Sequence, residues 1–131
     1  MGKRKGLVGD DDLSLRQFLT NMLRRNGYSI RAVSSGEKAL AAMAEDPADV
    51  VVTDLNMDGM SGMDVLQAVK RDHPETEVVM ITAFATTENA VAAMKNGAYD
   101  YVVKPFNVDE LKLILAKAFE KRALGAENRE L

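Results

Sequence analysis

Short apolar runs alternate with segments of helical periodicity along most of the chain, and this alternation limits the possible folds more than any other feature. Most of the runs are rich in β-branched residues, which favours strands. The predicted strands cover residues 6–9, 29–33, 50–53, 78–82 and 101–103. A helical segment follows each strand, so the sequence predicts an α/β domain with a parallel sheet and helices on both faces.

The five helical segments place apolar residues on one face and end at recognisable stop signals. Asn26-Gly27 and Asn96-Gly97 end the first and fourth helices, and Pro47 and Pro74 follow the ends of the second and third. The predicted apolar faces are Leu15, Phe18, Leu19, Met22 and Leu23; Ala39, Leu40 and Met43; Val65, Leu66 and Val69; Ala90, Val91 and Met94; and Leu111, Ile114, Leu115, Ala118 and Phe119.

Polar residues at helix starts predict the caps. Ser34 and Glu37 have the spacing of a capping box for the second helix, and Asn107 with Glu110 is expected to cap the last. We expect Asp12 to lie in the first turn of the first helix, where a carboxylate interacts favourably with the helix dipole. This leaves Asp12 without a role in a functional site.

Composition excludes several classes of protein. The 131 residues suffice for one domain, and the absence of cysteine excludes disulfides and thiolate metal sites and suits a reducing cytoplasm. No apolar run approaches the length of a membrane span, so we expect no membrane partner. A net charge of −3 argues against direct nucleic-acid binding by this chain.

Polar residues follow the strands at their carboxyl ends, which meet at one edge of a parallel sheet. These residues are Asp10-Asp11-Asp12, Asp54, Thr82-Ala83 and Lys104-Pro105. Carboxylates gathered at one point stay ionised only when a cation joins them, and hard oxygens with few further ligands suit Mg²⁺. Carboxylate nucleophiles can also form aspartyl-phosphates, with Thr82 and Lys104 placed to neutralise the phosphoryl charge.

The stretch TDLNMDGMSGMDVL, residues 53–66, also begins like a calcium-binding EF-hand loop. Such a loop closes with a bidentate glutamate at its twelfth position, which counted from Asp54 is Val65. A strand, not a helix, is predicted before the loop. Calcium binding is therefore disfavoured.

Four motifs in order, LVGDDDLSLRQFL, VVTDLNM, MITA and YDYVVKPF, resemble the receiver domain of bacterial two-component response regulators. The resemblance implies a flavodoxin-like (βα)5 doubly wound sheet with strand order 2-1-3-4-5. It implies that Asp54 accepts a phosphoryl group from the phosphohistidine of a sensor histidine kinase. It also implies that Mg²⁺ is bound by Asp54, directly by Asp11, through water by Asp10, and by the backbone carbonyl of Asn56.

The same resemblance assigns roles around the phosphoryl group. Thr82, the backbone N–H of Ala83 and Lys104 would contact its oxygens, and a cis bond before Pro105 would aim the lysine inward. Thr82 and Tyr101 resemble the family's switch pair, in which the aromatic ring fills space vacated by the hydroxyl. The surface of the fourth helix, fifth strand and fifth helix would then pass the signal to an output domain that controls transcription.

Two positions resemble those that tune the lifetime of the phosphoryl group, and two others depart from the family pattern. Asn56 and Phe84 lie where water would approach, and the bulk of Phe84 is expected to hinder it. Asp58 stands where the family usually has proline, and Gly9 stands where an apolar strand residue is usual. Neither departure removes a predicted ligand, so we expect an active receiver.

Other classes fit less well. A phosphatase of the haloacid dehalogenase type would need a second aspartate as general acid where Asn56 stands, and an amide cannot supply that proton. A flavin-binding module would need a phosphate-binding loop after the first strand, where the acidic run instead repels phosphate. We therefore expect a signalling domain that catalyses only its own phosphorylation and dephosphorylation.

The end of the chain, FEKRALGAENREL, resembles the junction between a receiver and the central domain of NtrC-type transcriptional activators. We expect residues 1–120 to form the receiver and residues 121–131 to begin a linker helix toward a missing effector domain. A homodimer through the last helix is expected as well. Gly125 is expected to interrupt that helix.

Overall fold

The computed structural model describes residues 3–130, with side chains described through residue 125. Five strands and five helices alternate as the sequence predicts: β1 Lys5–Gly9, α1 Leu13–Arg25, β2 Ser29–Val33, α2 Gly36–Glu45, β3 Val50–Asp54, α3 Gly62–Asp72, β4 Glu77–Thr82, α4 Thr87–Lys95, β5 Asp100–Val103 and α5 Val108–Glu130. Within the part of the chain that the structure describes, none of these helices combines the length and apolar character needed to cross a membrane.

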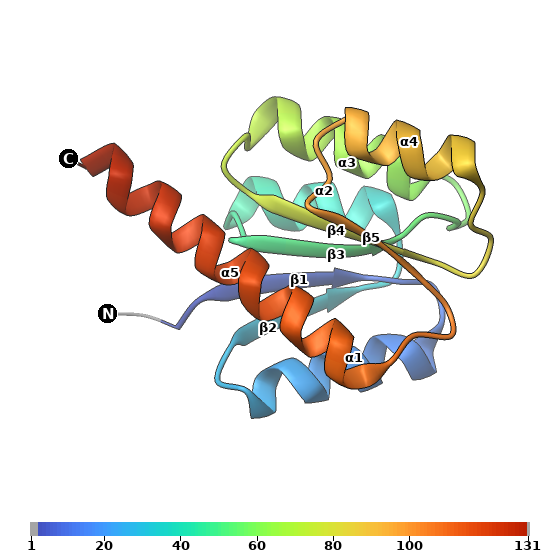
Figure 1. Cartoon of the computed structure of the whole chain (residues 1–131), viewed down its shortest axis with the longest axis horizontal. Helices are drawn as coiled ribbons and strands as arrows, with labels where there is room; N and C mark the ends of the chain where they lie inside the picture. Colours follow the sequence, from blue (N-terminus) through green and yellow to red (C-terminus); the bar gives the residue numbers. More distant parts are fainter. Residues whose placement is uncertain (1–2, 131) are drawn as a thin grey trace.

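The strands form one parallel sheet in the order β2-β1-β3-β4-β5 (Figure 1), which confirms the expected flavodoxin-like order. The register pairs Gly9 with Thr53 and Asp54 with Ile81. Because all five strands run in the same direction, their carboxyl ends lie along one edge. β3 lies at the centre of the sheet, and all five of its residues are buried.

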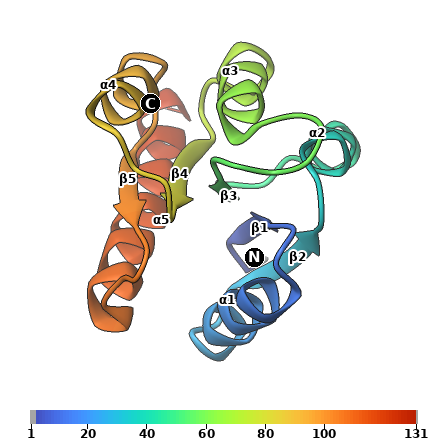
Figure 2. The same cartoon turned by 90° about the vertical axis from the view of Figure 1, so that its right-hand side faces the viewer.

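Helices cover both faces of the sheet, with α1 and α5 on one face and α2, α3 and α4 on the other (Figure 2). Alternate residues of the central strands supply the two cores, so Val51 packs with the α2 and α3 side chains while Val50 and Val52 pack with α1 and α5. On the latter face, the Phe119 ring of α5 stacks on Tyr28 with centroids 4.0 Å apart. Packing on both faces therefore buries the central strand β3, which ends at Asp54.

Two predicted helix starts are displaced by one residue. The α2 cap is Ser35, whose side chain accepts from the N–H of Lys38, so the capping box of Ser34 and Glu37 was wrong. Asp12 is the N-cap of α1 and accepts from Ser14 and Leu15 N–H, which places it just before the first turn. The cap of α5 is confirmed, because Asn107 Oδ1 accepts from Glu110 N–H at 3.0 Å.

Two other helical predictions were wrong. Val91 and Met94 of α4 are about half exposed, and Ala93 is the buried residue of that helix, because only a narrow stripe of α4 contacts the sheet. The α5 helix continues through Gly125 to Glu130 without interruption. One glycine costs a helix only about 1 kcal/mol relative to alanine, and good helix formers flank this one.

Gly9 is accommodated without distortion of the sheet. It is buried and pairs with Val33 on one side and Thr53 on the other, so β1 keeps its full register. A methyl group at this position would meet Val33, Thr53 and Ala39 at 3.7–3.9 Å, which is ordinary contact. The glycine therefore weakens β1 only through its own backbone freedom.

Candidate functional site

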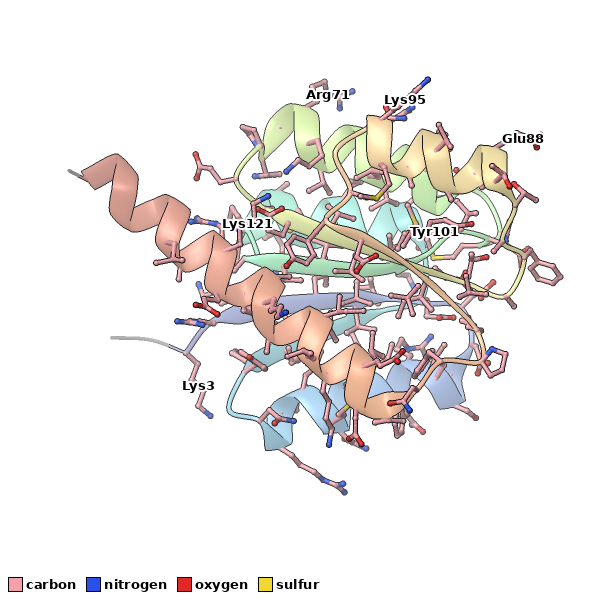
Figure 3. The ribbon with its side chains drawn as sticks, in the orientation of Figure 1. Lys3, Arg71, Glu88, Lys95, Tyr101 and Lys121 are labelled. Atoms are coloured by element: carbon pink, nitrogen blue, oxygen red, sulfur yellow. The ribbon has the colours of Figure 1, made fainter. Side chains whose placement is uncertain are left out.

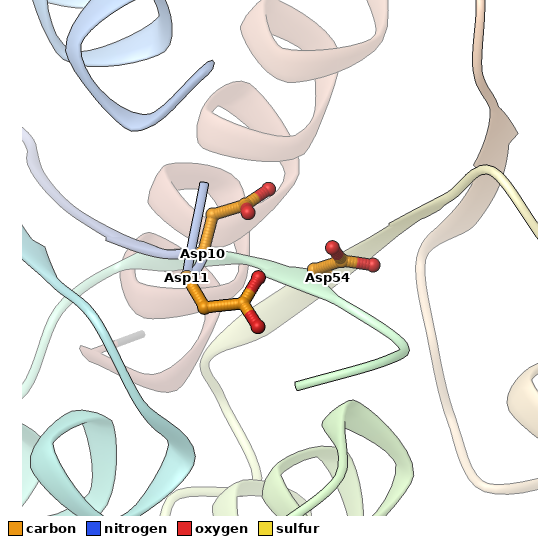
Figure 4. Close-up of side chains that lie close together, drawn as sticks. All are labelled: Asp10, Asp11 and Asp54. Carbon is orange, nitrogen blue, oxygen red and sulfur yellow. The ribbon is translucent and has the colours of Figure 1, made fainter. Parts of the chain in front are cut away.

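Three carboxylates converge at the carboxyl edge of the sheet. Asp10 and Asp11 follow β1, and Asp54 ends the adjacent strand β3, so the parallel pairing brings them together (Figure 4). One oxygen from each lies within 4.8 Å of the others. Asp58 does not belong to this group among the residues that the structure describes.

The Asp10 carboxylate is the most enclosed of the three. Burial raises its pKa, and the nearby Asp54 and Asp11 charges act in the same direction, while the Asp12 N–H and Lys104 oppose the shift. The Asp12 N–H donates to Asp10 Oδ1 at 2.8 Å, and the Arg16 side chain donates to the Asp10 carbonyl at 2.8 Å. The Asp10 side chain is therefore held in one orientation at an electrostatic cost.

Lys104 contacts two of the three carboxylates. Its Nζ lies 3.2 Å from Asp54 Oδ2 and 3.5 Å from Asp10 Oδ2. The Lys104 backbone N–H donates to the Thr82 carbonyl at 2.8 Å, which attaches the residue to the end of β4. The Lys104–Pro105 peptide bond is cis, as the resemblance implies.

The donor set fits a small divalent cation. Three carboxylates lie near the Lys104 ammonium, so the cluster carries an excess of negative charge. Hard oxygen donors that leave room for water suit Mg²⁺. The chemistry of the residues present thus agrees with the expected magnesium site.

Thr82 ends β4 beside the carboxylate cluster, and its side chain is fully buried. Its Oγ1 accepts from Asn56 Nδ2 at 3.2 Å and from Phe84 N–H at 3.0 Å. The Asn56 backbone N–H donates to Asp54 Oδ1 at 3.2 Å. Asn56 therefore contacts both the central carboxylate and the hydroxyl on the next strand.

Gly62 is a structural requirement of the site that the sequence reasoning missed. Its N–H donates to the Leu55 carbonyl at 2.8 Å, which closes the loop between β3 and α3. A Cβ at this position would lie 2.1 Å from the Asp54 carbonyl oxygen. The signal was present as a second glycine after Asp54, in the Ser61-Gly62 pair at the start of α3.

Phe84, the expected tuning residue, and Tyr101, the expected switch residue, occupy different environments. Phe84 is 72% exposed, at the start of the loop after Thr82. Tyr101 (labelled in Figure 3) is half-buried against the core of α2, α3 and α4. Its hydroxyl is enclosed and has no hydrogen-bond partner within the described part of the chain. Met80, two residues before Thr82, pairs with Tyr101, so Thr82 and Tyr101 face the same side of the sheet.

Comparison with known proteins identifies the family. The sequence model of the response regulator receiver domain family matches residues 7–116 of this chain. The chain belongs to this family. The receiver domain is 39% identical over 127 residues to the nitrogen assimilation regulatory protein NtrX of Azorhizobium caulinodans, covering 95% of this chain and 28% of that protein. It is 40% identical over 127 residues to the transcriptional regulatory protein ZraR of Salmonella typhimurium, covering 96% of this chain and 29% of that protein.

Solved structures agree with the assignment. A response regulator receiver domain from Clostridium thermocellum superposes with a TM-score of 0.86 at 32% identity, covering 92% of this chain and 98% of that one. NtrX from Brucella abortus superposes with a TM-score of 0.88 at 33% identity, covering 99% of this chain and 29% of that one. The receiver domain thus spans less than a third of its curated relatives, which are NtrC-type response regulators.

Proposed function

We propose that this receiver domain is a phosphorylation-dependent switch in which Asp54 accepts a phosphoryl group from a sensor histidine kinase. A carboxylate oxygen of Asp54 attacks phosphorus, the bond from phosphorus to the histidine nitrogen breaks, and the electron pair leaves with the imidazole. The observation that carries the proposal is the position of Asp54, at the end of the buried central strand, where it lies beside Asp10 and Asp11 and contacts Lys104.

The surrounding residues supply charge and orientation. Asp10, Asp11, Asp54 and the carbonyl of Asn56 would hold Mg²⁺, with Asp10 acting through water. The bound ion would neutralise the carboxylates and the incoming phosphoryl oxygens. Lys104, Thr82 and the Ala83 N–H would bind those oxygens, and the Lys104 contact with Asp54 supports this assignment.

The output follows from movement of Thr82 toward the phosphoryl group. Thr82 and Tyr101 share one face of neighbouring strands, which supports a coupled change at the α4, β5 and α5 surface. We place the reaction in the cytoplasm, with residues 121–131 leading to an effector domain that regulates transcription. The uninterrupted helix α5 is compatible with a homodimer through its last turns.

The acidic run offers a matched test of the metal site. Asp11→Asn removes a carboxylate from the cluster, whereas Asp12→Asn keeps an equally good helix cap outside it. Because mutation of an outer-shell partner alone typically costs about 10- to 100-fold in metal affinity, we expect loss of the direct ligand in Asp11→Asn to weaken Mg²⁺ binding by at least about tenfold and to slow phosphorylation by acetyl phosphate, while Asp12→Asn changes neither. Calorimetric titration with Mg²⁺ and intact-mass kinetics measure both effects. Equal losses in the two variants would refute the assignment of Asp11.

Phe84 is proposed to lengthen the life of the phosphoryl group by hindering the approach of water. Phe84→Ala is expected to shorten that lifetime severalfold with little change in stability, because the ring is exposed. Decay is followed by intact mass after removal of excess acetyl phosphate. An unchanged decay rate would show that the ring does not control access of water.

A further inference from the structure

The hydrogen bond from Asn56 to Thr82 connects the loop after β3 to the end of β4 and is not among the contacts assigned above to phosphoryl transfer. Asn56 Nδ2 donates to Thr82 Oγ1 at 3.2 Å across 26 positions of sequence. The Phe84 N–H donates to the same oxygen at 3.0 Å. Both acceptor positions of the Thr82 hydroxyl are therefore filled, one by the Asn56 side chain and the other by the Phe84 backbone N–H.

We propose that the Asn56 side chain is a latch that holds Thr82 in its resting orientation and so sets the free-energy cost of switching. The inference rests on the proposed function, in which the hydroxyl turns toward a phosphoryl group on Asp54. Turning about the Thr82 side-chain torsion separates Oγ1 from Asn56 Nδ2 and from the Phe84 N–H. The Phe84 donor is a backbone N–H and is present whatever the side chain. The Asn56 donor is a side-chain amide, so a substitution can remove it.

Burial makes this contact effective. Thr82 is fully buried, so its hydroxyl has little access to water that could replace a lost donor. Asn56 is exposed, so its side chain can be changed without disturbing the core. The metal ligand expected from Asn56 is its backbone carbonyl, which a side-chain substitution leaves in place. Asn56 thus acts on Thr82 as a positioning residue, separately from its expected metal contact.

The first test measures Thr82 directly, in the free protein without metal or phosphoryl group. The variant Asn56→Leu keeps the size of the side chain but removes the donor. Three-bond couplings from N and C′ to the Thr82 methyl carbon report the side-chain rotamer by NMR. We expect one dominant rotamer in the wild type and rotamer averaging in Asn56→Leu and in Asn56→Ala. An unchanged single rotamer in both variants would overturn the latch.

The second test measures the cost of switching with beryllofluoride and Mg²⁺, which together mimic the phosphoryl group on a carboxylate. Without the latch, the binding-competent state is more populated, so Asn56→Leu should bind the mimic about fivefold more tightly, the effect of one neutral hydrogen bond. In a Thr82→Ala background the same substitution should change the affinity less than twofold. A gain that persists in that background, or no gain in either, would overturn the latch.

The two tests also separate this inference from the proposed function. A wild-type chain that binds no beryllofluoride with Mg²⁺ contradicts phosphorylation at Asp54, whereas the rotamer measurement still decides whether Asn56 holds Thr82. A wild-type chain that binds the mimic, combined with an unaffected Thr82 rotamer, leaves the proposed function standing and rejects the latch alone.

Discussion

Gly62→Ala is expected to lower the free energy of unfolding by about 3 kcal/mol. The added Cβ would lie 2.1 Å from the Asp54 carbonyl oxygen and 2.8 Å from the Leu55 Cα. Both contacts are with backbone at the end of the buried central strand, where no side chain can rotate away. Relief requires α3 or the loop after β3 to shift, which also displaces Asp54. We therefore expect phosphorylation to fall together with stability.

Gly125→Ala is the matched control for this substitution. Gly125 lies within α5, and among the described residues a Cβ there would meet no atom within 4 Å outside the adjacent helix backbone. The same chemical change should raise the free energy of unfolding by about 0.5–1 kcal/mol, because alanine is the better helix former. Urea denaturation followed by circular dichroism measures both variants. Similar small effects at the two positions would contradict the close approach at Gly62.

Lys104→Met is expected to slow phosphorylation by acetyl phosphate by about 10²-fold, the typical loss when one charge-stabilising donor is removed. The same substitution should strengthen Mg²⁺ binding, because the ammonium that lies 3.2 Å from Asp54 and 3.5 Å from Asp10 competes with a cation for these carboxylates. Opposite changes in the two quantities distinguish a charge effect from general damage to the site, which would weaken both.

Lys95→Met provides the control. Lys95 is exposed at the end of α4, at the outer surface of the molecule (Figure 3). Its substitution by Met removes the same charge as Lys104→Met, but away from the carboxylates. It should leave Mg²⁺ affinity and phosphorylation rate within about twofold of wild type, since exposed charges beyond the Debye length are screened. If Lys95→Met matched Lys104→Met, net charge and not the local contact would account for the effect.

Much of the site could be predicted because a parallel sheet brings the ends of its strands together. Asp10, Asp54, Thr82 and Lys104 were placed at one edge from strand periodicity alone, and the contacts between Lys104 and both aspartates agree. The strand order came from the resemblance and not from the periodicity, since several orders are compatible with right-handed crossovers. The order observed in the structure agrees with that expectation.

Other features depend on three-dimensional contacts that local sequence does not encode. Ser34 and Ser35 are both good caps, and only the backbone geometry before α2 selects Ser35. Apolar residues of α4 suggested a wide buried face, but the helix lies against the edge strand β5 and buries little more than Ala93. The steric need for Gly62 arises from Asp54 and Leu55 on a neighbouring element, which no helix rule predicts.

The most direct test of the account is the intact mass of the chain after incubation with acetyl phosphate, with and without Mg²⁺. The account predicts that the wild type gains one phosphoryl group only when Mg²⁺ is present, and that Asp54→Asn gains none. The variant keeps the shape of the buried side chain, so a loss reports chemistry and not folding. Incorporation that is independent of Mg²⁺, or equal incorporation into Asp54→Asn, would contradict the assignment of Asp54 as the phosphoacceptor.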